Sequence, residues 1–526
     1  MDQPTDSIEA AKSRALEFGV AFLETIPEGA LDPALVQGIP VEWARTHVML
    51  PVRIEGEPCL LVGDPAEVGR QQDVVLLVGC ELRPVAAPRA VILKCIERCY
   101  FSRPKSAGDF LRDMDPDSLE SAKGGETRSD DLLKTSDEAP VTQLVNLILL
   151  DAVKARASDI HFEPFQSRLR VRYRVDGGLY EQTSPPKHME RALVSRIKVM
   201  AHLDIAEKRL PQDGMARVRV GEREIDIRAS TIPVAEGERV VLRLLNRESS
   251  VMSLDKLGMP APIRASFAAL LHEANGLVIV CGPTGSGKTT TLYTAIRQLD
   301  TRSRNVLTIE DPIEYQLPDI GQMQVKPKIG LTFARSLRHI LRQDPDVVLV
   351  GETRDNETAE ISVRASLTGH LVFTTLHTND AASALIRMMD MAVEPYLLAA
   401  ALRGVLAQRL VRRLCPVCRK PVPVSGRELS LLGGAGRRLE GATLYEPVGC
   451  ASCLGGYRGR VGIFELLVMN GEMEDLIRGG ASAARAIRAM PGNETRGSLL
   501  DDGLGKVLSG ETSLSEILYA LGISGA

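Results

Sequence analysis

The stretch GLVIVCGPTGSGKTTTLYTAI, residues 276–296, contains an apolar run, a glycine-rich loop and a helix-forming segment in direct succession. It matches the pattern G-x-x-x-x-G-K-[ST] in the strand, loop and helix context that phosphate-binding loops require. Gly282, Gly285 and Gly287 let backbone N–H groups turn inward onto phosphate oxygens, and the helix directs its positive end at the same anion. The stretch therefore predicts a nucleotide-binding loop within an α/β domain.

The ligands of this loop follow from the same spacing. Lys288 is expected to reach the β- and γ-phosphates of ATP, and Thr289 to offer its hydroxyl to Mg²⁺. The residues predicted to bind ATP and Mg²⁺ are Gly282, Pro283, Thr284, Gly285, Ser286, Gly287, Lys288, Thr289, Thr290 and the more distant Glu314.

Around this loop, apolar runs alternate with helical segments between residues 255 and 410. The runs are GLVIVCG, NVLTIED, DVVLVGE and HLVFTTL. Such alternation is typical of a mostly parallel sheet with helices on both faces. We therefore predict an α/β fold with a RecA-like core that carries the phosphate-binding loop.

Carboxylates follow two of these predicted strands. VLTIEDPIE supplies Glu310, Asp311 and Glu314, and DPDVVLVGETRD supplies Glu352. Ligands of open α/β sheets bind at the carboxyl ends of the strands, so these side chains are expected beside the phosphates. A magnesium-binding strand normally ends in aspartate, but this one ends in Gly351 and Glu352. Glu352 and Glu310 are the predicted catalytic carboxylates, and the sequence does not divide water activation between them.

A histidine follows a further strand of the same sheet. GHLVFTTLHTND places His377 at the carboxyl edge, where it could sense the γ-phosphate. His370, at the start of that strand, is expected to be structural.

Two pairs of arginines could supply the cation that phosphoryl transfer gains beside the γ-phosphate. Arg228 and Arg243 lie in IRASTIPVAEGERVVLRLL, and Arg338 and Arg342 lie in LRHILRQD. The second pair has the i, i+4 spacing of one helix face. Solvated surface charge is the alternative for both pairs.

Four of the nine cysteines form two CxxC pairs, at residues 415–418 and 450–453, with 31 residues between them. Two such knuckles fit a tetrahedral, structural Zn²⁺ held by Cys415, Cys418, Cys450 and Cys453. A redox or iron–sulfur site and unliganded thiols are the alternatives. The other five cysteines are scattered among apolar residues and are expected to be buried thiols.

The 526 residues carry a net charge of −4, with 44% hydrophobic, 25% charged and 4% aromatic residues. This composition is ordinary for a soluble, multidomain protein and provides no general attraction to nucleic acid. No apolar run approaches the ~18 residues that span a bilayer. The N-terminal segment MDQPTDSIEAAKSRALEF is acidic and amphipathic, so we do not expect a secretory signal.

The remaining segments differ in pattern. VMLPVRI, PCLLVGD and DVVLLVG resemble strands and RAVILKCIERCYF a helix, which suggests a small N-terminal α/β domain. The predicted divisions are an N-terminal domain 1–101, an acidic flexible linker 102–139, a second α/β domain 140–250, the core 255–410, a tetracysteine subdomain 411–465 and a helical region 466–526.

Six short motifs of the sequence together resemble those of the secretion traffic ATPases, which serve type II secretion, type IV pilus assembly and pilus retraction. The motifs are ASDIHFEP, QDG, GPTGSGKT, TIEDPIEY, LRQDPDVVLVGETRD and TTLHTND. The resemblance covers residues 140–520, and more loosely the first 100. LLAAALRGVLAQRLVRRLCPVC, YRGRVGIFELL and DDGLGKVLSGETSLSEIL look most similar to the C-terminal region of the type II secretion members, the GspE family. Retraction ATPases lack the tetracysteine element, which argues against them, whereas pilus assembly ATPases share it. Type IV pilus assembly ATPases are the alternative.

The resemblance implies a homo-hexameric ATP hydrolase of the translocase class. It would couple ATP hydrolysis to pseudopilus assembly and protein export across the outer membrane. Residues 140–250 would form a PAS-like domain that contributes Arg228 and Arg243 as catalytic groups, and Arg338 and Arg342 would be interface arginines. A Walker B strand ending in Gly-Glu is also a family feature.

The resemblance further implies a cytoplasmic protein attached peripherally to the inner membrane. Residues 1–101 would dock on the cytoplasmic domain of an inner-membrane platform protein, with acidic phospholipid as a further contact and no nucleic acid. Met215 after QDG, Ala392 and Thr353 depart from the family pattern, and none removes a predicted catalytic group. A nucleic-acid motor and a nucleotide-gated scaffold are the alternatives from other functional classes.

Overall fold

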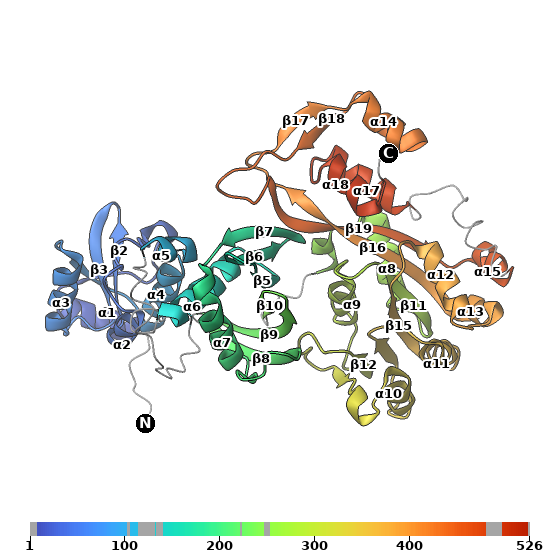
Figure 1. Cartoon of the computed structure of the whole chain (residues 1–526), viewed down its shortest axis with the longest axis horizontal. Helices are drawn as coiled ribbons and strands as arrows, with labels where there is room; N and C mark the ends of the chain where they lie inside the picture. The colour runs from blue at the N-terminus through green and yellow to red at the C-terminus, as the bar shows by residue number, and fades with distance from the viewer. Residues whose placement is uncertain are drawn as a thin grey trace. The chain divides into compact units, whose positions relative to one another are not determined.

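The structure is a computed structural model that describes residues 8–102, 106–113, 132, 140–220, 223–246, 253–479 and 497–523. The chain divides into two compact units, Met1–Ser249 and Ser250–Ala526 (Figure 1), and each is described by itself. Within the described residues, no helix combines the length and apolar character needed to cross a membrane.

The first unit begins with a four-stranded sheet of order β1-β4-β3-β2. Its elements are α1 (Ile8–Glu17), β1 (Ala21–Phe22), α2 (Val41–His47), β2 (Met49–Ile54), β3 (Glu57–Val62), α3 (Val68–Val78), β4 (Arg83–Ala86) and α4 (Arg89–Phe101). The prediction of a strand at DVVLLVG is wrong, because these residues form the end of α3. Of this helix only Val74 is buried, and Gly79 closes it in the left-handed conformation. An apolar β-branched run was mistaken there for a strand, since periodicity cannot decide short runs.

A helix lies within the segment that was expected to be a flexible linker. α5 (Ala107–Asp113) begins at a buried alanine whose N–H donates to Asp151 Oδ2 at 2.8 Å. Leu132 is also buried, and its N–H donates to the carbonyl of Arg219 at 2.8 Å. The expectation of flexibility is therefore wrong for these residues. Residues 103–105, 114–131 and 133–139 lie outside the described residues.

The second sheet of this unit is antiparallel, with order β7-β6-β5-β10-β9-β8. Its elements are α6 (Pro140–Lys154), β5 (Asp159–Pro164), β6 (Leu169–Val175), β7 (Gly178–Thr183), α7 (Glu190–Met200), β8 (Gln212–Val220), β9 (Arg223–Val234) and β10 (Gly237–Asn246). β6 reads LRVRYRV, and its apolar residues are buried while its arginines are half-buried. Tyr173 on the apolar face donates to the carbonyl of Ile148 in α6 at 2.6 Å. The strict alternation therefore separates a helix-covered face from a charged face.

The second unit is built on a seven-stranded sheet of order β13-β12-β14-β15-β11-β16-β19 (Figure 1). Its strands are β11 (Gly276–Cys281), β12 (Val306–Glu310), β13 (Gly321–Gln324), β14 (Val347–Val350), β15 (Leu371–Leu376), β16 (Leu402–Leu414) and β19 (Tyr457–Val468). All neighbouring pairs are parallel except β16 and β19. The predicted α/β fold with a mostly parallel sheet is confirmed.

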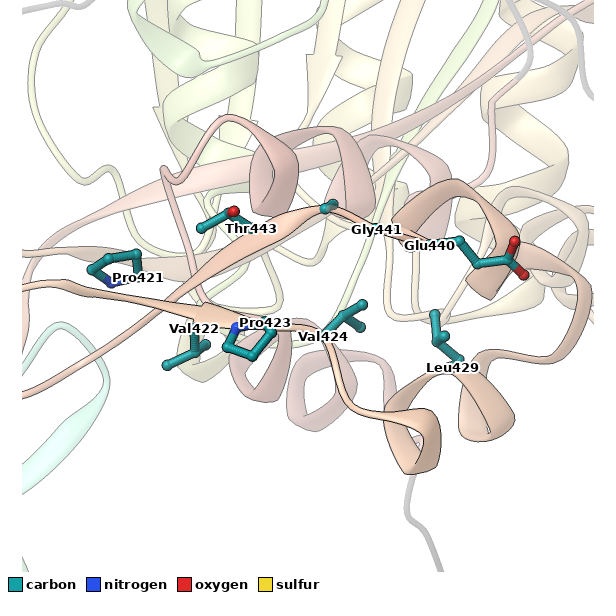
Figure 2. Close-up of a pocket in the computed structure, with 9 residues that line it drawn as sticks. Pro421, Val422, Pro423, Val424, Leu429, Glu440, Gly441 and Thr443 are labelled. Atoms are coloured by element: carbon teal, nitrogen blue, oxygen red, sulfur yellow. The ribbon is translucent and has the colours of Figure 1, made fainter.

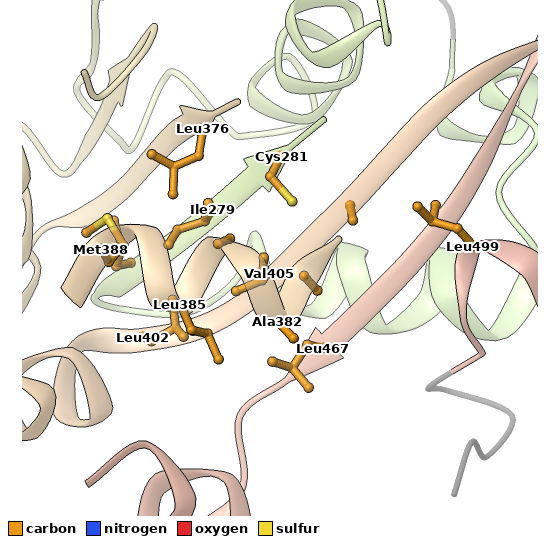
Figure 3. Packing of buried hydrophobic residues seen from close by; sticks show 14 of the residues in the cluster. Ile279, Cys281, Leu376, Ala382, Leu385, Met388, Leu402, Val405, Leu467 and Leu499 are labelled. Atoms are coloured by element: carbon orange, nitrogen blue, oxygen red, sulfur yellow. The ribbon is translucent and has the colours of Figure 1, made fainter. Parts of the chain in front are cut away.

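Both faces of this sheet are covered by helices. They are α8 (Ala261–Leu270), α9 (Lys288–Ile296), α10 (Phe333–Ile340), α11 (Asn356–Leu367), α12 (Ala381–Asp390) and α13 (Pro395–Ala401). Side chains of β11 alternate between two apolar clusters, with Ile279 and Cys281 in one and Val278 and Val280 in the other. The first cluster, shown in Figure 3, packs against α10 to α13, and the second packs against α8 and α9. The central strands β11 and β14 are buried along their whole length because neither face meets water, whereas the edge strand β13 is partly exposed.

β16 crosses the predicted boundary between residues 410 and 411, so the central sheet continues to Val468. The segment between β16 and β19 contains β17 (Lys420–Pro423), α14 (Gly426–Leu432) and β18 (Thr443–Glu446). The chain then forms α15 (Gly471–Arg478), α17 (Leu499–Leu508) and α18 (Leu514–Leu521), while residues 480–496 lie outside the described residues. Glu516 of α18 pairs with Arg412 of β16 at 2.6 Å, which ties the C-terminal helices to the sheet.

Candidate nucleotide-binding and metal sites

The glycine-rich loop connects β11 to α9 at the carboxyl edge of the sheet. Gly285 and Gly287 have φ of 79° and 88°, the left-handed region that favours glycine. Lys288 is 9% exposed, and its ammonium donates to the carbonyls of Gly282 at 2.8 Å and Pro283 at 3.1 Å. Burial lowers the pKa of Lys288. The lysine is thus anchored across the base of the loop, where it can turn towards an anion.

The structure brings Glu352 and His377 together beside this lysine. The Glu352 side chain is 12% exposed, and its Oε2 lies 3.6 Å from His377 Nε2. Arg354 Nη2 lies 2.6 Å from the other carboxylate oxygen. Burial lowers the pKa of His377, the Lys288 charge lowers it further, and Glu352 opposes both effects. The three predicted residues therefore form one cluster with a neutral imidazole.

Close approach of two strands explains why glycine stands at position 351, directly before Glu352. Its N–H donates to the carbonyl of Ile309 at 2.7 Å. A Cβ at this position would lie 2.9 Å from the same oxygen and 3.4 Å from the Cα of Glu310. Only glycine lets the end of β14 approach β12 this closely. The unusual Gly-Glu ending therefore brings the backbones of Glu310 and Gly351 together.

Glu310 is 4% exposed and its carboxylate is already engaged by other side chains. Thr308 Oγ1 donates to it at 2.6 Å, Gln322 Nε2 donates at 3.0 Å, and the Tyr293 hydroxyl also donates. Burial and Glu310 raise the pKa of Tyr293, so the phenol remains a donor. Because Tyr293 belongs to α9, Glu310 links the loop helix to β12. Glu314 is exposed in the loop that follows.

Arg228 and Arg243 are direct neighbours across β9 and β10 in the first unit. Arg243 is 62% exposed, and its Nε donates to Asp159 Oδ1 at 3.0 Å. Met215, which departs from the family pattern, pairs in register with Arg228. Arg217 lies two residues further along β8 and pairs with Asp226 at 3.0 Å. The two arginines are thus side by side on the charged face of their sheet.

Contrary to the prediction from their spacing, Arg338 and Arg342 do not lie on the same helix. Arg338 is on α10 and pairs with Glu357 at 2.5 Å. Arg342 lies two residues beyond the last residue of α10, with its Nη2 2.8 Å from His339 Nδ1. The expectation that both lie on one face of a helix is therefore wrong. Arg338 lies on α10, but the helix ends before Arg342. Both side chains are exposed.

Sequence reasoning missed Gln408, Tyr293 and Gln322. Gln408 lies on β16, is 2% exposed, and donates from Nε2 to the carbonyl of Ser286 in the loop at 2.6 Å. The available signal was a single amide within the apolar run GVLAQRLV. Nothing local to that run connects it with a loop 122 residues earlier.

The four predicted metal ligands form one cluster, with their Sγ atoms within 4.8 Å of one another. The Cys415–Cys450, Cys418–Cys453 and Cys450–Cys453 Sγ distances are 3.9, 3.7 and 3.7 Å. A Zn–S bond of about 2.3 Å places tetrahedral ligands about 3.8 Å apart. Backbone N–H groups of Gly449 and Cys450 also point at Cys418 and Cys453 sulfurs, each at 3.3 Å. The cluster therefore fits one Zn²⁺.

An open groove of about 480 Å³ lies between the β17–β18 hairpin and α14 (Figure 2). Val422, Val424 and Leu429 give it an apolar lining, together with prolines, glycine and the polar Glu440 and Thr443. The lining contains no metal-ligand set and no nucleophile paired with a base, so the catalytic candidates are those at the sheet edge.

Two family models match the sequence of this chain. The family model "Type II/IV secretion system protein" covers residues 134–519, and the MshEN domain model covers residues 18–105. "Type II secretion system protein E" of Dickeya dadantii (strain 3937) is 52% identical over 391 residues, 74% of this chain and 77% of that relative. "Type IV pilus assembly ATPase PilB" of Myxococcus xanthus (strain DK1622) is 42% identical over 98% of this chain and 92% of its own length.

A solved structure supports the fold independently. The ATPase DotB of Legionella pneumophila superposes with a TM-score of 0.55 at 20% identity, over 76% of this chain and all of that one. At this identity the match establishes a shared fold. The family model, in contrast, covers well over half of the sequence. The chain therefore belongs to the type II/IV secretion system protein family.

Proposed function

We propose that this protein is an ATPase that powers type II secretion by coupling ATP hydrolysis to pseudopilus assembly and protein export. The observation that carries the proposal is the cluster of Lys288, Glu352 and His377 at the loop edge of the sheet. Such a cluster combines a phosphate-binding cation, a carboxylate and a neutral imidazole. The cation and the carboxylate match the phosphate-binding lysine and the water-positioning residue of phosphoryl transfer.

In this proposal Glu352 orients the attacking water and accepts its proton. The bond from the water oxygen to the γ-phosphorus forms while the bond to the ADP oxygen breaks, which releases phosphate. Lys288 balances the charge on the phosphate oxygens, and neutral His377 donates a hydrogen bond towards the γ-phosphate. Mg²⁺, held with the Thr289 hydroxyl, would neutralise the remaining charge. Glu310 keeps α9 and β12 in place, because three donors already occupy its oxygens.

The assembly is proposed from family membership. Six copies would form a ring in which Arg228 and Arg243 reach the nucleotide and Arg338 and Arg342 lie at interfaces. Residues 1–101 would dock on the cytoplasmic domain of an inner-membrane platform protein, with acidic phospholipid as a further contact. This places the protein in the cytoplasm, peripherally attached to the inner membrane. The four cysteines would hold one structural Zn²⁺.

The deciding experiment measures phosphate release by the purified full chain with Mg-ATP. Turnover is expected to rise with the cytoplasmic domain of the platform protein and with anionic vesicles, and light scattering should detect a hexamer. Stimulation by single-stranded DNA alone would overturn the secretion proposal in favour of a nucleic-acid motor. Absence of turnover under every condition would favour a nucleotide-gated scaffold.

Pilus assembly is the second candidate, because a pilus assembly ATPase is 42% identical over 98% of this chain. Deleting the gene in the bacterium that encodes it separates the two. Loss of extracellular proteins with normal surface pili supports secretion. Loss of pili with normal extracellular proteins would transfer the proposal to pilus assembly.

A further inference from the structure

A glutamine amide lies under the phosphate-binding loop. Gln408 is polar but only 2% exposed, and it belongs to β16, which lies between β11 and the edge strand β19. β16 pairs with β11 up to Ala407 opposite Cys281, so Gln408 is the next residue beneath the start of the loop. A buried amide is costly unless it is hydrogen-bonded. Its Nε2 donates to the Ser286 carbonyl at 2.6 Å, while its buried Oε1 has no hydrogen-bond partner among the described residues.

The contact determines which way one loop peptide faces. In a trans peptide, the carbonyl of one residue and the N–H of the next point in opposite directions. Since the Ser286 carbonyl is held towards Gln408, the N–H of Gly287 faces away from β16. That N–H is among the donors with which such loops cradle phosphate. Reversal of the peptide would present a carbonyl to the anion instead.

Two glycines of the loop lie so close to Gln408 that a side chain on either would contact it. A Cβ at Gly282 would lie 2.4 Å from the backbone carbonyl oxygen of Gln408, and a Cβ at Gly287 would lie 3.1 Å from Gln408 Nε2. Gly287 also has the positive φ of 88° that glycine tolerates. The backbone of β16 therefore restricts position 282 whatever side chain residue 408 carries, whereas the Gln408 side chain itself narrows the space only at Gly287.

We propose that Gln408 is a positioning residue of the nucleotide site, which holds the Ser286–Gly287 peptide with its N–H towards the β-phosphate. The inference rests on the proposed ATPase function and adds a residue to it. Gln408 touches the loop rather than the nucleotide, so its loss reduces the contribution of the phosphates to binding. The adenosine part of the ligand is unaffected.

The first test is Gln408→Met, which keeps the side-chain volume and removes the donor. Fluorescent ADP and AMP are titrated against the wild type, this variant and the control Gln298→Met, an exposed glutamine just after α9. ADP affinity should fall roughly tenfold, the effect of leaving a buried carbonyl unpaired. AMP affinity should fall less, so the ADP/AMP preference shrinks. General destabilisation would weaken both ligands together.

The second test is Gln408→Glu, which keeps the shape and makes the donor depend on pH. A protonated carboxyl can donate to the Ser286 carbonyl, whereas a carboxylate repels it. ADP affinity relative to the wild type should therefore recover as the pH is lowered, and Gln408→Met should show no recovery. If Gln408→Met does not fold, recovery of ADP affinity at low pH in Gln408→Glu still tests the role of Gln408.

The outcomes separate the two levels of the proposal. A wild-type chain that binds no nucleotide would sink the proposed function itself. A wild type that binds ADP tightly, with an unchanged ADP/AMP preference in Gln408→Met and no acid recovery in Gln408→Glu, would overturn the role of Gln408 alone.

Discussion

The candidate nucleotide site and the tetracysteine site are built in opposite ways. The nucleotide site collects unlike groups from separate strand ends, with Lys288, Glu352 and His377 between 9% and 46% exposed. The tetracysteine site gathers four identical groups from two short turns, with sulfur distances near 3.7–3.9 Å. An open, asymmetric site suits a ligand that must react and leave. A closed, symmetric shell suits an ion that stays and stabilises the fold.

One strand connects the two sites. β16 carries Gln408 beneath the phosphate-binding loop and ends at Leu414, directly before Cys415. Seven strand residues span roughly 23 Å, too far for direct chemistry between the sites. The comparison therefore predicts that each site can be disabled while the other keeps its ligand.

The largest expected effect is that of Glu352→Gln. We expect ATP binding to persist and turnover to fall at least ~100-fold, because an essential proton acceptor is lost. Zinc content should remain at about one ion per chain. The measurements are steady-state phosphate release, ADP titration and elemental analysis. Unchanged turnover would return the catalytic role to Glu310.

The reciprocal change is Cys415→Ser combined with Cys418→Ser. Zinc content should fall from about one ion per chain to none, and residues around 415–457 should exchange amide hydrogens faster, since metal-binding energy is folding energy there. Cys80→Ser, in the first unit, is the matched control and should keep the zinc. Wild-type protein purified under reducing conditions without zinc would contradict the metal assignment.

A smaller effect is expected from Gly351→Ala. The added Cβ would meet the Ile309 carbonyl at 2.9 Å and displace the end of β14. Turnover should fall about tenfold, because small misplacements of catalytic groups are costly, while zinc content stays constant. Gly471→Ala is the control, since a Cβ there meets nothing within 4 Å. Wild-type turnover in Gly351→Ala would show that the close approach of β14 and β12 is dispensable.

The smallest effect concerns the pH dependence from His377. Its folded-state pKa lies below 6.5, so the unfolded chain takes up the proton first. Stability from this group is complete above about pH 6.5 and declines as the pH falls towards the lowered value. His377→Asn should flatten this decline in thermal unfolding below about pH 6.5, with His370→Asn as control. An unchanged pH profile in His377→Asn would argue against a lowered pKa of this imidazole in the folded protein.

Most of the fold could be predicted where patterns are long. Alternating apolar runs and helices in the second unit gave the correct class, and the covered sheet faces explain why. The strand predicted at the short run DVVLLVG was wrong because these apolar residues end a helix in which only Val74 is buried. α5 was missed because its acidic, serine-rich surroundings read as a linker, whereas Ala107 and Asp151 hold it in place.

The candidate site was predictable in its parts but not in their connections. Spacing identified the phosphate-binding loop, the two acidic strand ends and the cysteine pairs. It could not show that Tyr293 and Gln322 occupy the carboxylate of Glu310. Those contacts join residues that share no local pattern, so no periodicity reports them.

By itself, the sequence determined the chemistry of each site, since glycine, lysine and cysteine at fixed local spacings dictate which ligand can bind. Only the tertiary structure showed how the surroundings of the two acidic residues differ. It engaged Glu310 internally, left Glu352 beside Lys288 and His377, and set Gln408 under the loop. The physical reason is that a hydrogen bond depends on distances of a few ångströms in space. Packing of strands and helices sets those distances between residues that lie far apart in the chain.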